Sequence, residues 1–240
     1  MPSWVPYFTL ILLPFLVVFP FNVVAFLWGF QHGSQPMPEQ LALRSKKIDN
    51  LYVKWLRDAI LLLLVGSLAV KYSVSFSRIG LRLSDWPRNL FIGIGASLLQ
   101  ASLQWFVWER TPPEKGLLGD RRLLEESAVE WSVSNIISVL AQEIWIAFCF
   151  VTLRQIGRST VISLVLIGVV FGVAHYQYKL GAIVTALYGV VFASLFLWRG
   201  SLLPSFVVHY VGNISSLFWA RRRDRHLTGS GQVVHTGNTV

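Results

Sequence analysis

Residues 131–153 read WSVSNIISVLAQEIWIAFCFVTL, an apolar run with a single charged side chain, Glu143. A helix needs about 20 predominantly apolar residues to cross a bilayer, so this run is long enough to span one. Glu143 is also the only acidic residue between Trp131 and Ala220. An ionisable group at membrane depth is costly and marks a functional site by default. The run therefore predicts a membrane helix that carries a functional acid.

The whole chain has the composition of a membrane protein. Of its 240 residues, 54% are hydrophobic and 14% are charged, whereas a soluble domain carries about 25% charged residues. We expect an all-α, polytopic transmembrane helix bundle of about seven spans, with eight possible. The seven apolar runs are Trp4–Phe30, Tyr52–Val70, Leu90–Trp108, Trp131–Leu153, Val161–His175, Leu180–Trp198 and Leu202–Ala220.

The basic residues lie between these runs and give the chain a net charge of +9. Topology signals and lipid head-group contacts belong there, so the expected partner is the lipid bilayer and not nucleic acid. With seven spans, one side of the membrane receives 14 of the 21 Lys and Arg residues. The positive-inside rule then predicts a multi-pass protein of the plasma (inner) membrane with a cytoplasmic C-terminus. Lys54, Arg57 and Asp58 are expected near the membrane surface.

We expect one membrane domain in three parts. Residues 1–130 would form N-terminal transmembrane helices with basic loops. Residues 131–220 would form the core that carries the polar motifs. Residues 221–240 begin with an arginine cluster and continue as a polar tail, which predicts disorder.

Two histidines lie in the later apolar runs, each with a companion four residues away. His175 follows Phe171, and His209 precedes Asn213, so each pair shares one helix face. A single histidine could simply hydrogen-bond a neighbouring helix, but two such pairs favour a site. No Lys or Arg lies within seven residues of Glu143. Histidines on other helices are therefore its expected partners.

A carboxylate and two imidazoles support two kinds of chemistry. Glu143, His175 and His209 could bind zinc as a three-ligand catalytic site. Alternatively, Glu143 could act as general base on a water molecule, with His and Asn stabilising an oxyanion and no cofactor required. Asn135 and Gln142 share a helix face beside Glu143, and these two residues and Phe171 are expected to bind ligand. The HExxH and GxSxG motifs are absent.

The order of these motifs resembles the CAAX-protease and bacteriocin-processing (CPBP, or Abi) membrane family, which includes the Rce1-type prenyl-protein proteases. That family carries an EExxxR motif, then FxxxH, then HxxxN. Here FxxxH is Phe171–His175 and HxxxN is His209–Asn213, with RGSLLPSF at residues 199–206 between them. The resemblance covers residues 131–217.

The resemblance implies an intramembrane endopeptidase that cuts a membrane-anchored peptide or protein. His175 would orient the water, and His209 and Asn213 would stabilise the oxyanion. The first motif departs from the family, because its paired glutamates fall on Gln142 and Glu143 and its arginine falls on Ala147. An amide cannot replace a carboxylate as base. Glu143, about 100° further around the helix, could do so only through helix rotation or a π-bulge.

Three functions remain open on the sequence. The first is an active endopeptidase that uses Glu143 as base or metal ligand. The second is a catalytically inactive relative, a membrane scaffold, chaperone or immunity factor, which the substitutions at Gln142 and Ala147 favour. The third is a transporter with a Glu/His proton relay at the membrane midplane.

Overall fold

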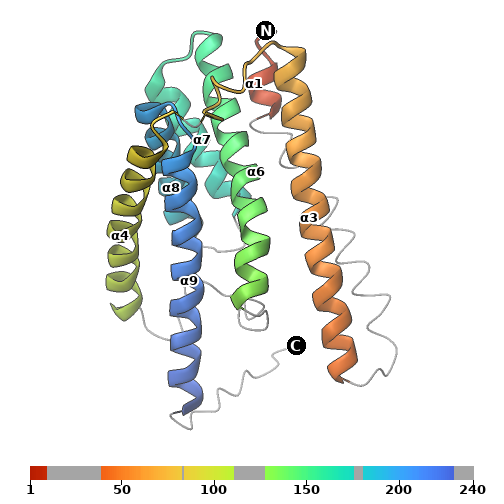
Figure 1. The fold of residues 1–240 in the computed structure, drawn as a ribbon, viewed down its shortest axis with the longest axis vertical. Helices are drawn as coiled ribbons and strands as arrows, with labels where there is room; N and C mark the ends of the chain where they lie inside the picture. Colours follow the sequence, from red (N-terminus) through yellow and green to blue (C-terminus); the bar gives the residue numbers. More distant parts are fainter. Residues whose placement is uncertain (10–38, 83, 111–127, 176–180, 230–240) are drawn as a thin grey trace.

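The computed structural model describes residues 1–9, 39–82, 84–110, 128–175 and 181–229. These residues form seven helices and no strand, which confirms the all-α class (Figure 1). The helices are α1 (Val5–Tyr7), α3 (Glu39–Lys71), α4 (Trp86–Arg110), α6 (Ala128–Gln155), α7 (Thr160–Ala174), α8 (Gly181–Arg199) and α9 (Leu203–Gly229).

Each of the later six apolar runs lies largely within one helix, and two of these helices extend well beyond the run. α3 begins at Glu39, inside the polar segment before Tyr52, and α9 continues past Ala220. Most of the first run, the loop at 111–127 and the end of the tail lie outside the described residues. By length and composition, Val129–Gln155 and Ala182–Arg199 are able to cross a membrane. The expected number of seven spans is therefore not confirmed.

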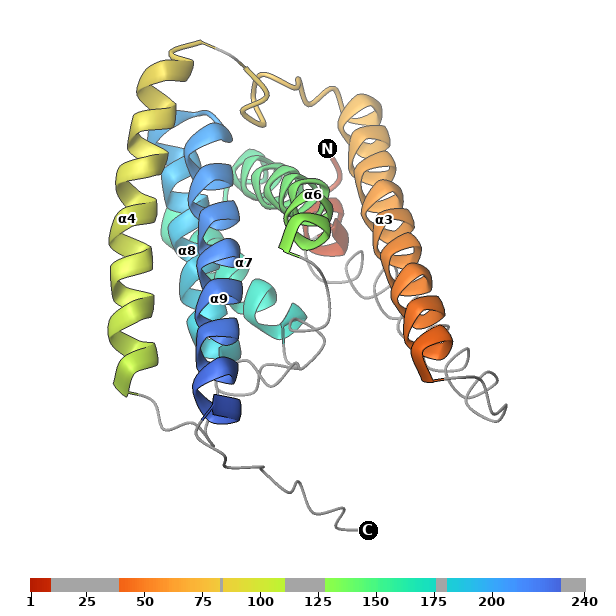
Figure 2. The ribbon, with the colours of Figure 1, turned by 60° about the horizontal axis from the view of Figure 1, so that its bottom comes forward.

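Helix α6 lies at the centre of the bundle. Figures 1 and 2 show α3 on one side of it and the group α7, α8 and α9 on the other, with α4 outside α9. Helix α6 contacts α1, α3, α7, α8 and α9, while α4 packs on α9 and α7 packs on α8. A side chain on α6 can therefore meet a partner from either half of the bundle.

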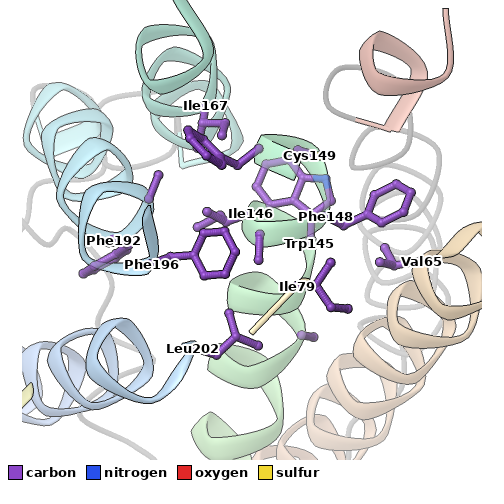
Figure 3. Packing of buried hydrophobic residues seen from close by; sticks show 14 of the residues in the cluster. Val65, Ile79, Trp145, Ile146, Phe148, Cys149, Ile167, Phe192, Phe196 and Leu202 are labelled. Carbon is purple, nitrogen blue, oxygen red and sulfur yellow. The ribbon is translucent and has the colours of Figure 1, made fainter. Parts of the chain in front are cut away.

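The apolar core surrounds the second half of α6. Ile146 and Phe148 of α6 are fully buried there. Phe192 and Phe196 of α8 lie on the side of α6 opposite Val65 of α3 (Figure 3). Burial of such side chains removes apolar surface from water in a soluble protein, but in a lipid environment the gain comes from close packing. This core fixes how α6 is rotated about its own axis.

Two tight turns precede α7 and α9. Gly157 adopts φ +80° just after α6, and the Ser159 side chain then accepts a hydrogen bond of 3.2 Å from the Ile162 N–H to cap α7. Gly200, at φ +58°, ends α8 and reverses the chain into α9. The first turn brings α7 back against α6, and the second brings α9 back against α8.

Candidate active site

Small residues bring α7 and α8 into close contact. A Cβ atom added at Gly168 would lie 2.9 Å from the Ala186 carbonyl oxygen, and one at Gly172 would lie 2.7 Å from that of Ala182. In the other direction, a Cβ at Gly189 would lie 2.8 Å from Phe171 Cβ. Small residues at such positions allow helix backbones to approach. The buried Phe171 is held against α8 as a result.

Phe171 lies against the rings of both motif histidines. Its ring centroid is 4.6 Å from that of His175 and 5.7 Å from that of His209. On α8, Phe192 stacks on His209 with centroids 4.5 Å apart and planes 14° apart. The His209 ring is therefore enclosed by aromatic side chains from two helices, which limits its rotation. Phe192 could not be identified from the sequence, because it lies in an apolar run with no motif.

Glu143 meets His209 directly. The distance between Glu143 Oε1 and His209 Nδ1 is 2.8 Å, and the Glu143 side chain is 0% exposed. Helix α6 is a regular α-helix throughout residues 128–155, so no π-bulge forms. The packing of α6 in the bundle turns Glu143 toward α9. Glu143 Oε2 has no hydrogen-bond partner among the described residues.

His175 has a defined orientation at the end of α7. Its Nδ1 lies 2.7 Å from the Phe171 carbonyl oxygen. A carbonyl only accepts, so Nδ1 carries the proton of this hydrogen bond, and in the neutral ring Nε2 is left as an acceptor. The same backbone-and-ring contact with Phe171 fixes the side chain relative to His209.

The asparagine of the third motif contacts a second asparagine on α6. Asn213 Nδ2 donates to Asn135 Oδ1 over 3.4 Å. Asn135 is 5% exposed, and its own Nδ2 has no partner in the described part of the chain. The half-buried Gln142 likewise has a buried Oε1 without a partner there. These unpartnered atoms lie on the same helix as Glu143.

The described residues contain no group of three His, Cys, Asp or Glu side chains that could hold a metal ion. The zinc set of Glu143, His175 and His209 that the sequence left open stays an expectation, which metal analysis of the purified protein tests. The structure pairs Glu143 with His209, pairs Asn135 with Asn213, and connects His175 to His209 through Phe171.

Ala147, where the family motif has arginine, is part of the apolar core. It is fully buried together with Ile146 and Phe148. An arginine there would place a charge among apolar side chains, which is strongly unfavourable without a partner. The small apolar side chain of Ala147 therefore suits this apolar core, whereas the arginine of the family motif would not.

Helix α3 supplies a polar cluster that the sequence placed only near the membrane surface. Asp58 is 2% exposed and accepts hydrogen bonds from Arg57 at 2.7 and 2.8 Å and from the Ser138 hydroxyl. Lys54 Nζ donates to Ser134 Oγ over 3.2 Å. The signal available in the sequence was an acidic residue inside an apolar run. These contacts lie on the α3 side of α6, with Ser138 about one helical turn and Ser134 about two turns before Gln142.

Residues 125–215 match the family model described as type II CAAX prenyl endopeptidase Rce1-like. Comparison with curated proteins gave no match. Comparison with solved structures also gave no match. The matched segment includes α7, α8 and the Glu143–His209 pair. The expected CPBP/Rce1-type family is thus confirmed, and residues 125–215 carry an Rce1-like domain.

Proposed function

We propose that this protein is an intramembrane endopeptidase that hydrolyses a membrane-anchored peptide or protein by activated-water attack. The observation that carries the proposal is the buried Glu143–His209 pair, in which one carboxylate oxygen is bonded and the other has no partner among the described residues. A carboxylate in this state can hold a water molecule and accept its proton.

The proposed substrate class is a prenylated CAAX tail, because the matching family is described as CAAX prenyl endopeptidases. Such a tail is anchored in the bilayer and would reach the site from the lipid. Large apolar side chains are exposed along the helices, including Phe91 and Leu98 of α4 and Ile183 of α8. Lipid contact suits these surfaces. The bundle would therefore admit a lipid-anchored substrate sideways.

In the proposed reaction, Glu143 Oε2 takes a proton from water as the oxygen attacks the scissile carbonyl. The carbonyl oxygen becomes an oxyanion, and the second N–H of Asn213 Nδ2 donates to it. The C–N bond then breaks, and Glu143 returns the proton to the leaving amine. His175 Nε2, an acceptor in the neutral ring, orients the water. Donors aimed at an oxyanion typically contribute factors of about 10²–10³ in rate.

His209 receives a different task from the one that the resemblance implies. Its Nδ1 is committed to Glu143 Oε1. If Nδ1 carries the only ring proton, Nε2 cannot donate to an oxyanion. We therefore assign His209 to holding the carboxylate in place and stabilising its charged form. It stabilises the oxyanion only when the ring is doubly protonated.

Cleavage of a fluorogenic prenylated CAAX peptide by the purified protein in liposomes tests the proposal. We expect the wild type to cut and the unprenylated peptide to be cut far more slowly. Cutting should persist with a strong chelator. Stoichiometric zinc that is lost in His175→Ala would contradict the metal-free account.

A second candidate is a catalytically inactive relative that binds the peptide without cutting it. Gln142, which cannot act as a base, and the buried Ala147 favour this candidate. It predicts that wild type binds but does not cut and that Gln142→Glu restores cutting. Proton-coupled flux in the same liposomes, with no cutting, would instead support a transporter.

A further inference from the structure

We propose that Asn135 and Gln142 hold the substrate by its backbone, Asn135 as donor to a peptide carbonyl and Gln142 as acceptor from a peptide N–H. This inference rests on the proposed function only in taking a peptide as the ligand. Gln142 would then bind substrate, whereas a glutamate at this position would act as the catalytic base.

The unpartnered atoms of the two side chains are complementary to a peptide. Asn135 Oδ1 accepts from Asn213, which leaves Asn135 Nδ2 as a buried donor without a partner in the described residues. Gln142 Oε1 is a buried acceptor without one. Buried polar groups are nearly always hydrogen-bonded in folded proteins. Two exceptions of opposite kind on one helix therefore indicate groups kept for a ligand.

The spacing also fits an extended peptide. Asn135 and Gln142 are seven residues apart, which is about 10.5 Å along an α-helix and about 20° in rotation, so both lie on one face. An extended chain rises about 3.3 Å per residue. A peptide lying along α6 would therefore contact the two side chains at groups about three residues apart.

The position of this face connects binding to the reaction. Gln142 immediately precedes Glu143, and Asn135 contacts Asn213 of α9. A peptide whose N–H reaches Gln142 Oε1 has its neighbouring carbonyl close to Glu143. The scissile bond would thus lie at the Gln142 end of the bound segment, and Asn135 would fix the register at the other end.

A series of prenylated CAAX peptides tests this, each with one backbone N–H replaced by an ester oxygen. Binding is measured in nanodiscs with Glu143→Gln as the background, so that no peptide is cut. We expect one ester position to weaken binding about 5- to 10-fold, the effect of one net hydrogen bond. Adding Gln142→Met should remove that difference at the same position only. Asn135→Asp, which replaces the donor by an acceptor, should weaken binding of every peptide.

Ser138→Ala is the matched control, because Ser138 lies on α6 between the two side chains but bonds Asp58 on α3. It should leave peptide affinity unchanged. Equal loss at every ester position, with no dependence on Gln142, would overturn the inference. If both amides were turned, Asn213 would hold the free donor; Asn213→Asp would then weaken binding and Asn135→Asp would not, which would contradict the assignment to Asn135.

The experiments distinguish failure of the proposed backbone contacts from failure of the proposed endopeptidase activity. Coupling of one ester position to Gln142, in a protein whose wild type cuts nothing, would support the backbone contacts and reject the endopeptidase. Cutting by the wild type without any such coupling would support the endopeptidase and reject the backbone contacts. A well-folded Glu143→Gln protein that binds none of the peptides would contradict the inference.

Discussion

A buried carboxylate lies on each of two sides of helix α6: Asp58 of α3 on one side, and Glu143 of α6 itself, which faces α9, on the other. The two carboxylates differ in how many of their oxygens are hydrogen-bonded. On the α3 side, Asp58 uses Oδ1 for Arg57 and Oδ2 for Ser138. On the α9 side, Glu143 uses Oε1 for His209, while Oε2 has no partner among the described residues. Both residues are at most 2% exposed.

This difference separates a structural acid from a reactive one. Asp58 is neutralised by a permanently charged guanidinium, and both of its oxygens are bonded, so little is left for chemistry. Glu143 faces an imidazole, which unlike a guanidinium carries no permanent charge, and its Oε2 has no partner among the described residues. Both residues are buried, so burial does not tell the structural acid from the reactive one. Only the completeness of their hydrogen bonding distinguishes them.

The largest expected effect follows Glu143→Gln. The amide keeps the shape of the side chain but cannot accept a proton, so kcat for the prenylated peptide should fall by about 10²–10⁴. Thermal unfolding in detergent should remain close to that of the wild type. Cutting at an undiminished rate by this variant would show that Glu143 is not the base.

Arg57→Met tests the α3 side. It leaves Asp58 buried without its counter-charge, and removing one partner of a buried pair typically costs about 3–5 kcal/mol. We expect a lower free energy of unfolding, measured by denaturant in mixed micelles. Arg57→Met combined with Asp58→Asn should recover part of the loss. No recovery would mean that Arg57 stabilises the fold through packing and not through Asp58.

Asp58→Asn alone should have a smaller effect, because Arg57 is 27% exposed and can turn toward water. Loss of a hydrogen bond to a charged group costs about 1.5–3 kcal/mol. The folded fraction should cut the peptide with unchanged kcat. A fall in kcat as large as that of Glu143→Gln would end the distinction between the two acids.

Ser138→Ala should have the smallest effect of the four. It removes the hydroxyl that donates to Asp58 and accepts from Arg57. Loss of a hydrogen bond to a charged group costs about 1.5–3 kcal/mol, and we expect a loss of unfolding free energy at or below the low end of this range because both charges remain paired with each other. Arg57 still bonds Asp58 after the change. A loss of unfolding free energy larger than that of Arg57→Met would show that Ser138 of α6, and not Arg57 of α3, contributes most to holding Asp58.

Much of the architecture could be predicted from the sequence because it is local. The apolar runs from Tyr52 to Ala220 are helical in the structure, since long apolar segments must satisfy their backbone groups internally in a bilayer. The order of the motifs was sufficient to indicate the family that residues 125–215 match. The pairing of Glu143 with a histidine on another helix also followed from the absence of a nearby Lys or Arg.

Other features are set by how whole helices pack. Which of Gln142 and Glu143 faces His209 depends on the rotation of α6, and one residue changes that direction by about 100°. The same rotation directs Ser138 to Asp58 and buries Ala147 where the family has arginine. The stacking of Phe192 on His209 depends on the close approach of α7 and α8.

The sequence by itself determined the helices, their order and the side chains available for chemistry, because helix formation and motif spacing are properties of short segments. Only the tertiary structure decided which carboxylate oxygen is left unbonded, because that depends on contacts between residues as far apart as Glu143 and His209. The direction of a side chain on α6 is fixed by the packing of α3, α7, α8 and α9 around it.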